Sequence, residues 1–312
     1  MISKNLKRQF LHDMLRLRLI EERLAAIYHP ADEIKTPMHL YTGQEAVAVG
    51  VCAALKGGDT VSPSHRSHGW YLAKGGNLNA MMAELMGKEA GCSGGWGGSM
   101  HLVDVKAGVM GSSSILAATV PHAVGCALAF QLKGEDKVAI APAGDAATEE
   151  GVFHESLNWA ALKKLPVIFI CENNLYSTTT PLEQRQPNVE IYKRAAAYGI
   201  PGVQCNGNDV LEVYTIALEA IERARQGQGP SFIETMTYRW RAHVGPYHDW
   251  DAGYRTKQEV ETWMAHCPIK KLSQEFSTQE IEKFKTEIDQ EIDASLEFAR
   301  RSSFPSKEAI KI

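Results

Sequence analysis

Two apolar runs separated by a helical segment constrain the fold of this 312-residue chain more than any other feature. The run KVAIAPA (137–143) precedes Gly144, residues 151–164 place apolar side chains at helical spacing, and PVIFIC (166–171) is a second, β-branched run. Two buried strands joined by a crossover of this length are expected to be parallel, with a right-handed connection. The sequence therefore predicts a strand–helix–strand unit.

The same alternation continues downstream of this unit. GVQCNGND (202–209) is typical of a strand and a turn, and PSFIETMTYRW (230–240) indicates another strand. Residues 210–227 between them have a helical pattern that Asn208 or Asp209 can cap. We expect an α/β fold with a doubly wound, mostly parallel sheet flanked by helices.

Charged, amphipathic helical patterns occupy both ends of the chain. They predict an N-terminal helical arm over about residues 1–30 and a C-terminal helical tail over about residues 256–312, and residues 43–56 also have a helical pattern. No shift in composition marks a linker between two units. Residues 1–312 are therefore predicted to form a single domain.

Composition and charge exclude several functional classes. The chain is 44% hydrophobic and 22% charged, as globular proteins are, and its net charge of −4 disfavours binding to nucleic acid or to an anionic membrane. Charged residues interrupt every apolar segment at the N-terminus, so no secretory signal is expected. Six cysteines without a CxxC pair suit a reducing compartment, which predicts a cytoplasmic protein.

Two uncharged segments suggest a pocket or an interface. No Asp, Glu, Lys or Arg lies between Lys106 and Lys133, but Pro121, His122 and a GSSS stretch break this window, which favours a buried segment over a membrane span. Residues 91–100 (GCSGGWGGSM) are either a flexible linker or a loop at the edge of a pocket. The apolar segment that follows favours the loop.

Polar side chains follow the two neighbouring strands of the first unit. Asp145 and Asn174 come at the carboxyl ends of these strands, where ligands bind in open parallel sheets, although both residue types are also common in turns. A carboxylate and an amide oxygen suit Mg²⁺ that retains positions for phosphate oxygens. A helix beginning near Gly151 would add N–H groups that favour phosphate. These residues predict a site for a magnesium-bound diphosphate.

The sequence resembles a known family in six ordered blocks that cover roughly residues 5–270. GD and an NN pair ending at Asn174, with 28 residues between Asp145 and Asn174, are similar to the thiamine-diphosphate motif. The six blocks resemble the alpha subunit of thiamine-dependent 2-oxo acid dehydrogenase components and of acetoin dehydrogenases; they are MHLYTGQEAVAVG (38–50), HRSHGWYLAKGG (65–76), GKEAGCSGGWGGSMH (87–101), ILAATVPHAVGCALA (115–129), residues 144–176 and YRWRAH (238–243). The resemblance implies a thiamine-diphosphate-binding fold.

The resemblance also implies roles for individual residues. Asp145, Asn174 and the carbonyl of Tyr176 would bind Mg²⁺, and His39 and His243 match two active-site histidines. The remaining implied residues contact the cofactor: Arg66 and His65 at the diphosphate, Ser114 and Leu116 at the aminopyrimidine ring, and Gly144, Ala146 and Ala147 around the motif.

Some positions depart from the family pattern. Ala146 stands where the family usually has glycine, and His65 where it more often has tyrosine. Val244 and HDWD (248–251) replace a serine-containing segment, so regulation by phosphorylation at that serine is not expected. The histidines and aspartates of this loop could in isolation bind zinc, but such residues gather on loops by chance.

The resemblance implies partners as well as a reaction. The glutamate that activates the aminopyrimidine would come from a beta subunit in an α2β2 heterotetramer, and the acyl group would pass to a lipoyl acyltransferase subunit. The substrate would be a small 2-oxo acid such as pyruvate, or acetoin. The alternatives are a thiamine-dependent carboligase or transketolase-like half-enzyme that needs no lipoyl partner, and a non-catalytic scaffold.

Overall fold

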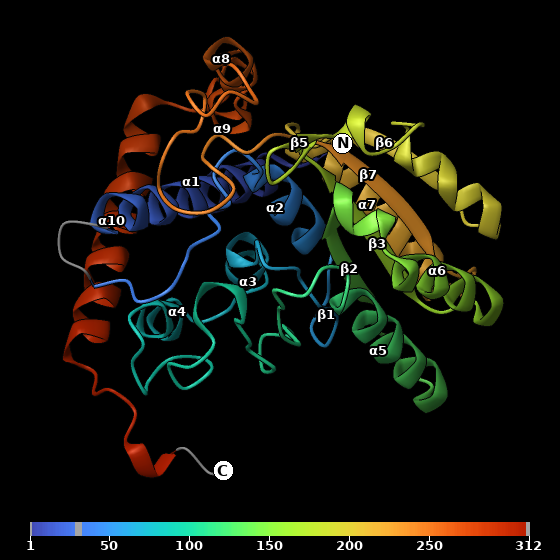
Figure 1. The fold of residues 1–312 in the computed structure, drawn as a ribbon, viewed down its shortest axis with the longest axis horizontal. Helices are drawn as coiled ribbons and strands as arrows, with labels where there is room; N and C mark the ends of the chain where they lie inside the picture. The colour runs from blue at the N-terminus through green and yellow to red at the C-terminus, as the bar shows by residue number, and fades with distance from the viewer. Residues whose placement is uncertain (1, 29–32, 310–312) are drawn as a thin grey trace.

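The fold is built on a five-stranded sheet in which all neighbouring strands are parallel, in the order β1-β2-β3-β7-β6 (Figure 1). The computed structural model describes residues 2–28 and 33–309. The strands are β1 (Thr60–Val61), β2 (Ala139–Gly144), β3 (Val167–Asn173), β6 (Gly202–Asn206) and β7 (Ser231–Met236), with a separate antiparallel pair of β4 (Tyr176–Ser177) and β5 (Thr180–Pro181). The predicted α/β class with a parallel sheet is confirmed.

Helices cover both faces of the sheet. The α-helices are α1 (Lys4–Ile27), α2 (Glu45–Ala53), α3 (His68–Ala73), α4 (Leu78–Leu85), α5 (Thr119–Lys133), α6 (Gly151–Lys163), α7 (Val210–Arg225), α8 (Lys257–Ala265), α9 (Pro268–Ser273) and α10 (Thr278–Arg301). Short 3₁₀ helices are η1 (Gly98–Met100), η2 (Asp145–Glu149), η3 (Leu182–Gln184), η4 (Ile191–Tyr198) and η5 (Lys307–Ala309). In Figure 1, α5 and α6 lie on one side of the sheet, and α1, α2 and α10 on the other.

Alternating side chains on the central strands feed two hydrophobic cores. Ile140 of β2 and Ile168 of β3 join the core built with α1, α2, α4, α7 and α10. Ala139 of β2 and Phe169 of β3 point the other way, into the core built with α5, α6 and η4. This period of two is the property of an extended strand that the β-branched runs predicted.

The two terminal helices pack on each other and on the first core. Buried side chains of α1 include Phe10, Met14 and Ile20. Arg16 of α1 donates two hydrogen bonds to Glu291 of α10, with Nε and Nη2 each 2.7 Å from a carboxylate oxygen. The predicted arm and tail are therefore brought together by residues 275 positions apart, which no local pattern indicates.

Three further features of the sequence can be located in the fold: the uncharged window, the cap of α7 and the cysteines. The uncharged window between Lys106 and Lys133 forms a loop followed by α5, and no helix within the described ranges is both long and apolar enough to cross a membrane. Asp209 caps α7, where its carboxylate accepts the N–H groups of Leu211 and Glu212. The six cysteines are all free thiols.

Candidate active site

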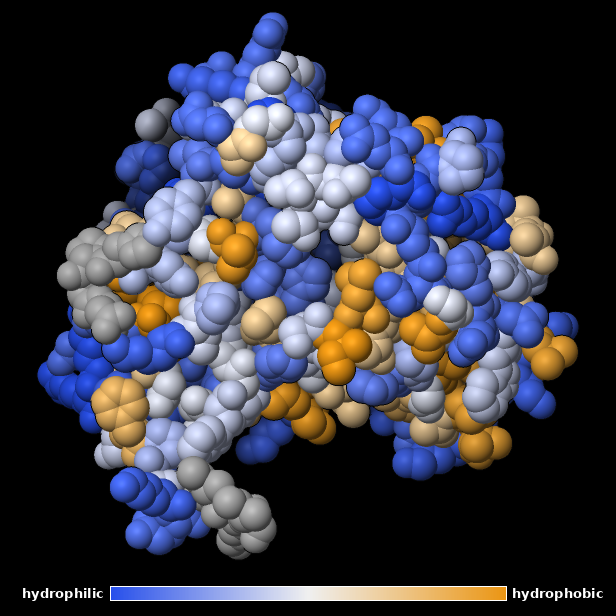
Figure 2. Space-filling view, in the orientation of Figure 1, coloured by the Kyte–Doolittle hydropathy of each residue, from blue (hydrophilic) through white to orange (hydrophobic). Residues whose placement is uncertain are grey.

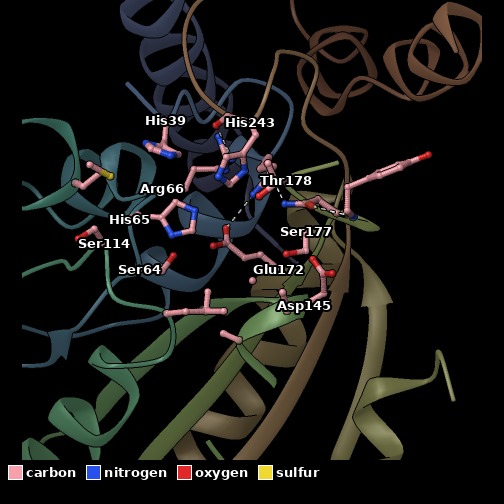
Figure 3. A pocket seen from close by; sticks show the side chains of 18 residues that line it. His39, Ser64, His65, Arg66, Ser114, Asp145, Glu172, Ser177, Thr178 and His243 are labelled. Atoms are coloured by element: carbon pink, nitrogen blue, oxygen red, sulfur yellow. Dashed lines mark hydrogen bonds between the residues drawn. The ribbon is translucent and has the colours of Figure 1, made fainter. Parts of the chain in front are cut away.

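A cavity of about 240 Å³ lies at the carboxyl edge of the sheet (Figure 3). The sequence-predicted site residues all line it: His39, His65, Arg66, Ser114, Leu116, Gly144, Asp145, Ala146, Ala147, Asn174, Tyr176 and His243. Six further residues complete the lining, which the sequence analysis did not assign: Gln44, Ser64, Met100, Glu172, Ser177 and Thr178. Segments from seven parts of the chain (39–44, 64–66, 100, 114–116, 144–147, 172–178 and 243) thus meet at one place.

Asp145 is buried where β2 gives way to η2. Its carboxylate forms an ion pair with Arg185, whose guanidinium also contacts Glu149. Burial raises the pKa of Asp145, and the charge of Arg185 opposes this rise. Burial thus favours the protonated form of this carboxyl group, and the neighbouring cation favours its charged form.

A chain of amides fixes the orientation of Asn174. Its Nδ2 donates to Oε1 of Gln44 at 3.1 Å, and Nε2 of Gln44 donates to Oε1 of Glu172 at 3.4 Å. Oδ1 of Asn174 is thereby turned toward the backbone N–H of Tyr176, at 3.4 Å. The intervening residue, Leu175, has a left-handed φ of 72°, which is uncommon for a leucine and typical of backbone held at functional sites.

Glu172 lies fully within this network. Its carboxylate accepts hydrogen bonds from the hydroxyl of Tyr41 and from Nε1 of Trp70, the latter at 3.1 Å. Burial raises the pKa of Glu172 to about 7, although these donors act in the opposite direction. Together with Nε2 of Gln44, these two donors hold the carboxylate in place at the wall of the cavity.

Arg66 is a buried cation that binds backbone oxygens. Its Nη1 donates to the carbonyl of Leu40 at 2.6 Å and its Nη2 to the carbonyl of His243 at 3.2 Å. No carboxylate among the described residues lies within 4.0 Å of its guanidinium nitrogens to form an ion pair. Burial, followed by the charge of Arg239, lowers the pKa of Arg66 to about 10. A positive charge in this position favours an anion in the cavity.

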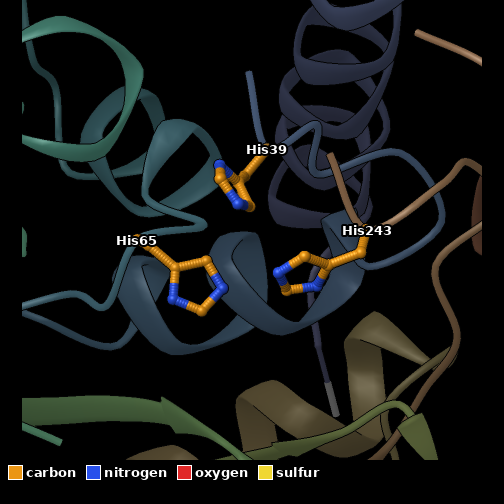
Figure 4. A group of neighbouring side chains, drawn as sticks. All are labelled: His39, His65 and His243. Carbon is orange, nitrogen blue, oxygen red and sulfur yellow. The ribbon is translucent and has the colours of Figure 1, made fainter. Parts of the chain in front are cut away.

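Three histidines gather at one end of the cavity (Figure 4). The ring centroids are 4.8 Å apart for His39 and His65, 5.0 Å for His39 and His243, and 5.5 Å for His65 and His243. Burial, followed by the charge of Arg66, lowers the pKa of His39 to about 2, of His65 to about 4 and of His243 to about 3. All three imidazoles are neutral at neutral pH.

A buried polar network supports His39. Its backbone N–H donates to Oγ of Ser99 at 3.3 Å, and this hydroxyl lies 2.8 Å from Nε2 of His68. Nδ1 of His68 lies 2.7 Å from Oε1 of Glu21. The network fixes the backbone of His39, whereas Nδ1 of its own ring is buried without a hydrogen-bond partner among the described residues.

Glu84 at the end of α4 organises the glycine-rich loop. Its buried carboxylate accepts four backbone N–H groups of the loop: Ser93 at 2.7 Å, Gly95 at 2.9 Å, Gly97 at 2.7 Å and Gly98 at 2.9 Å. Gly95 has a φ of 82° and Gly98 a φ of 64°, which explains glycine at these positions. The loop leads directly to Ser99 and to Met100 in the cavity wall, so it is the predicted pocket-edge loop.

The loop that follows His243 holds its polar groups in other contacts. Asp249 accepts hydrogen bonds from Arg239 at 2.9 Å and from Arg255 at 2.6 Å, and His248 stacks on Trp250 with ring centroids 4.1 Å apart. Within the described residues the groups that could hold a metal do not include this loop, but they do include the three histidines of the cavity. The structure gives no support to zinc binding by His248 and its neighbours.

The sequence matches the family described as "Dehydrogenase E1 component" over residues 12–308. This chain belongs to that family. Membership implies thiamine diphosphate as the cofactor, and as an alpha subunit of the E1 type the chain has a beta subunit as its partner. The resemblance expected from the sequence is confirmed.

Three relatives of this E1 chain belong to two kinds of enzyme. The alpha subunit of acetoin:2,6-dichlorophenolindophenol oxidoreductase from Bacillus subtilis is 40% identical over 297 residues, covering 94% of this chain and 88% of that protein. The pyruvate dehydrogenase E1 component subunit alpha is 39% identical over 312 residues in Porphyra purpurea, covering 96% and 90%, and 42% identical over 261 residues in Rhizobium meliloti, covering 83% and 74%. The main prediction of an E1 alpha subunit is confirmed.

Two features of this E1 site differ from the sequence-based picture. The cavity is lined by η2, and Gly151 at the start of α6, where a phosphate was expected, is not among its lining residues. Arg185, which holds Asp145, lies 40 residues downstream and was not predicted. Glu172 did carry a sequence signal, because it is the acidic end of an otherwise apolar run.

Proposed function

We propose that this E1 alpha subunit binds the diphosphate of thiamine diphosphate through Mg²⁺ and acts on a small 2-oxo acid such as pyruvate, or on acetoin. One observation carries the proposal: oxygen atoms of the kind that Mg²⁺ prefers, a buried cation and three histidines line a single cavity at the carboxyl edge of the sheet. Such edges are where open α/β sheets bind their ligands.

The donor set of the cavity fits Mg²⁺. The carboxylate of Asp145, Oδ1 of Asn174 and the carbonyl of Tyr176 would be its protein ligands, which leaves positions for phosphate oxygens and water. Gln44 supports this assignment because it accepts from the amide nitrogen of Asn174, and the amide oxygen, which accepts the N–H of Tyr176 at 3.4 Å, has a second lone pair for the metal. On binding, Mg²⁺ would replace the contact that Asp145 now makes with Arg185.

The cationic and polar walls fit the remainder of the cofactor. Arg66 would bind the diphosphate, with His65 beside it, because a buried guanidinium without an ion pair to any described carboxylate gains most from an anion. The residues that would lie along the cofactor are Ser114, Leu116, Gly144, Ala146 and Ala147, all of which line the cavity. Ala146 is compatible with this role because its side chain is small.

The chemistry would be shared between the cofactor and neutral histidines. Thiamine diphosphate, when bound, supplies a carbon nucleophile and an electron sink for cleavage beside a carbonyl. His39 and His243 would orient the substrate carbonyl and accept or donate protons there, which neutral imidazoles can do through their two ring nitrogens. Buried walls would exclude water from that end of the cavity.

The glutamate that activates the aminopyrimidine ring is proposed to come from the beta subunit. Glu172 lines the cavity, but its carboxylate is committed to Tyr41, Trp70 and Gln44. The beta subunit would complete the site across an interface in an α2β2 assembly.

The face that carries α5 and α6 is the proposed interface with the beta subunit. Large hydrophobic side chains are exposed there, with exposed fractions of 70% for Ile115, 77% for Leu132, 50% for Trp159 and 75% for Leu162. Figure 2 shows hydrophobic residues over the region of α5 and α6. Exposed apolar surface of this kind favours association with another chain.

Six free thiols also support a cytoplasmic location.

The cofactor assignment is tested with the chain co-expressed with its beta subunit. Thiamine diphosphate affinity in the presence of Mg²⁺, measured by titration calorimetry, should fall on the order of 100-fold in Asp145→Asn, because a charged metal ligand is removed. Asp251→Asn, a change of the same kind on an exposed residue, should bind normally. Full affinity in Asp145→Asn would overturn the metal site.

The substrate is tested by turnover of the assembled enzyme. Identities of 40% to an acetoin enzyme and 39% to a pyruvate enzyme do not separate the two, so both compounds and branched 2-oxo acids are compared with a lipoyl acyltransferase present. Dependence on that acyltransferase supports the proposal. Equal turnover without it would indicate a thiamine-dependent carboligase instead.

A further inference from the structure

The histidine cluster, defined as His39, His65 and His243, has the arrangement of a metal site that is separate from the oxygen ligands proposed for Mg²⁺. Each residue offers a ring nitrogen, and these three nitrogens all lie within 4.8 Å of one another. Figure 4 shows the three rings facing a common centre from three different segments of the chain. One cluster thus combines three ligands of a single chemical kind.

The ring separations match those of coordinated imidazoles. With Zn–N bonds of about 2.0–2.1 Å and tetrahedral angles, two ring centres lie about 5.2 Å apart and two ligand nitrogens about 3.3 Å apart. The observed centroid separations of 4.8, 5.0 and 5.5 Å lie on both sides of that value. The rings are therefore at the right spacing, and side-chain rotations that move each ligand nitrogen by about 1 Å would close the site.

The histidine cluster is held in place before any metal binds. Arg66 follows His65 in sequence and bonds the carbonyls of Leu40 and of His243, so one guanidinium ties together the three segments that carry the ligands. The backbone N–H of His39 is bound to Ser99. The main chain of the ligands, fixed in this way, loses little conformational freedom on coordination, so only the side chains must reorient.

An unused buried nitrogen lies in the histidine cluster. The side chain of His39 is 7% exposed, and its Nδ1 has no hydrogen-bond partner among the described residues. Arg66 opposes a cation, and Glu172 beneath it partly offsets that charge.

We propose that His39, His65 and His243 bind a divalent transition metal of the Zn²⁺ class, with the fourth position open to the cavity. Three imidazole ligands select such a metal, because Mg²⁺ prefers oxygen ligands. The bound ion blocks the end of the cavity where substrate is proposed to react, and the metal is therefore an inhibitor of the enzyme. This inhibition rests on the proposed function, whereas metal binding does not.

The test uses the alpha–beta complex without thiamine diphosphate, in a buffer whose excess Mg²⁺ occupies oxygen sites. Co²⁺ is titrated as the probe, because a four-coordinate site with nitrogen ligands gives far stronger visible absorption than a six-coordinate oxygen site. We expect one strongly absorbing Co²⁺ for each alpha chain, which Zn²⁺ displaces. Asp145→Asn should retain this absorption.

Single variants assign the ligands. His39→Gln, His65→Gln and His243→Gln should each weaken Co²⁺ binding by at least about tenfold, whereas His248→Gln, in the nearby loop but outside the cluster, should bind as wild type does. Weak absorption in the wild type, or unchanged affinity in all three cluster variants, overturns the site and leaves aromatic packing as the reason for the cluster. Failure of the proposed function has a different signature, since the same complex would then bind no thiamine diphosphate.

Discussion

Replacement of Glu84 by glutamine tests whether one carboxylate orders the glycine-rich loop. The carboxylate accepts two N–H groups on each oxygen: Ser93 and Gly95 on Oε2, and Gly97 and Gly98 on Oε1. Glutamine has nearly the same volume but only one oxygen, so its amide nitrogen must face two of these donors. The change removes both the charge and half of the acceptors without creating a cavity.

The size of the effect follows from these contacts. A hydrogen bond to a charged group contributes about 1.5–3 kcal/mol, and a buried donor left unpaired costs about 1–3 kcal/mol. Because a glycine-rich loop can shift to recover part of this loss, we expect the free energy of local opening at residues 93–98 to fall by about 2–4 kcal/mol. At about 1.4 kcal/mol per factor of ten, amide exchange should accelerate roughly 30- to 1,000-fold.

Hydrogen exchange of the alpha–beta complex, followed by mass spectrometry of peptides that cover residues 91–100, measures this acceleration. Glu89→Gln is the matched control, because Glu89 is an exposed carboxylate four residues after the end of α4. Exchange that is unchanged in Glu84→Gln, or equally fast in Glu89→Gln, would refute the reasoning. When the loop opens, Ser99 loses its hydrogen bond with the backbone N–H of His39, so turnover should also fall.

Three other predictions concern the floor of the cavity. The pKa of Glu172 is raised from 4.5 to about 7, so the folded state binds its proton more tightly than the unfolded state does. The stabilisation from this group is complete below pH 4.5 and is lost as the pH rises to about 7. In Glu172→Gln the free energy of unfolding, measured by urea unfolding of the complex at several pH values, should therefore fall by about 3 kcal/mol less over this pH range. Gln44→Leu frees the amide of Asn174 and should weaken thiamine diphosphate binding by about 1–3 kcal/mol in calorimetry, and normal affinity would show that this orientation is unimportant. Arg185→Leu should destabilise the cofactor-free complex by about 3–5 kcal/mol, because Asp145 is left buried and unpaired. The double variant Asp145→Asn with Arg185→Leu should recover stability, and its failure to do so would contradict the ion-pair argument.

Local patterns in the sequence were sufficient for the parallel sheet and for the ends of its strands. The β-branched run at residues 166–171 became β3, and Asp145 and Asn174 follow their strands as expected. Strand order was not accessible in the same way. Insertion of β7 between β3 and β6 depends on pairing between distant segments, which no window of a few residues contains.

The supporting residues of the site were harder to predict than the residues that line it. Arg185 contacts Asp145 across 40 positions, and Arg66 binds carbonyl oxygens, which every residue type possesses. Glu84 did carry a signal, because it is the only charged residue between Lys74 and Lys88 in a segment rich in Met and Leu. A lone carboxylate in such a segment needs buried donors, and glycines nearby can provide them.

The bracing of the cavity by Arg66 has a consequence for how such an enzyme can change. The guanidinium recognises main-chain oxygens near positions 39 and 243, and these oxygens stay in place whatever side chain each position carries. New side chains can therefore be tried at 39, 65 and 243 on an unaltered frame. A substitution at one of these three positions therefore changes the chemistry of that side chain while the main-chain frame that carries it is retained.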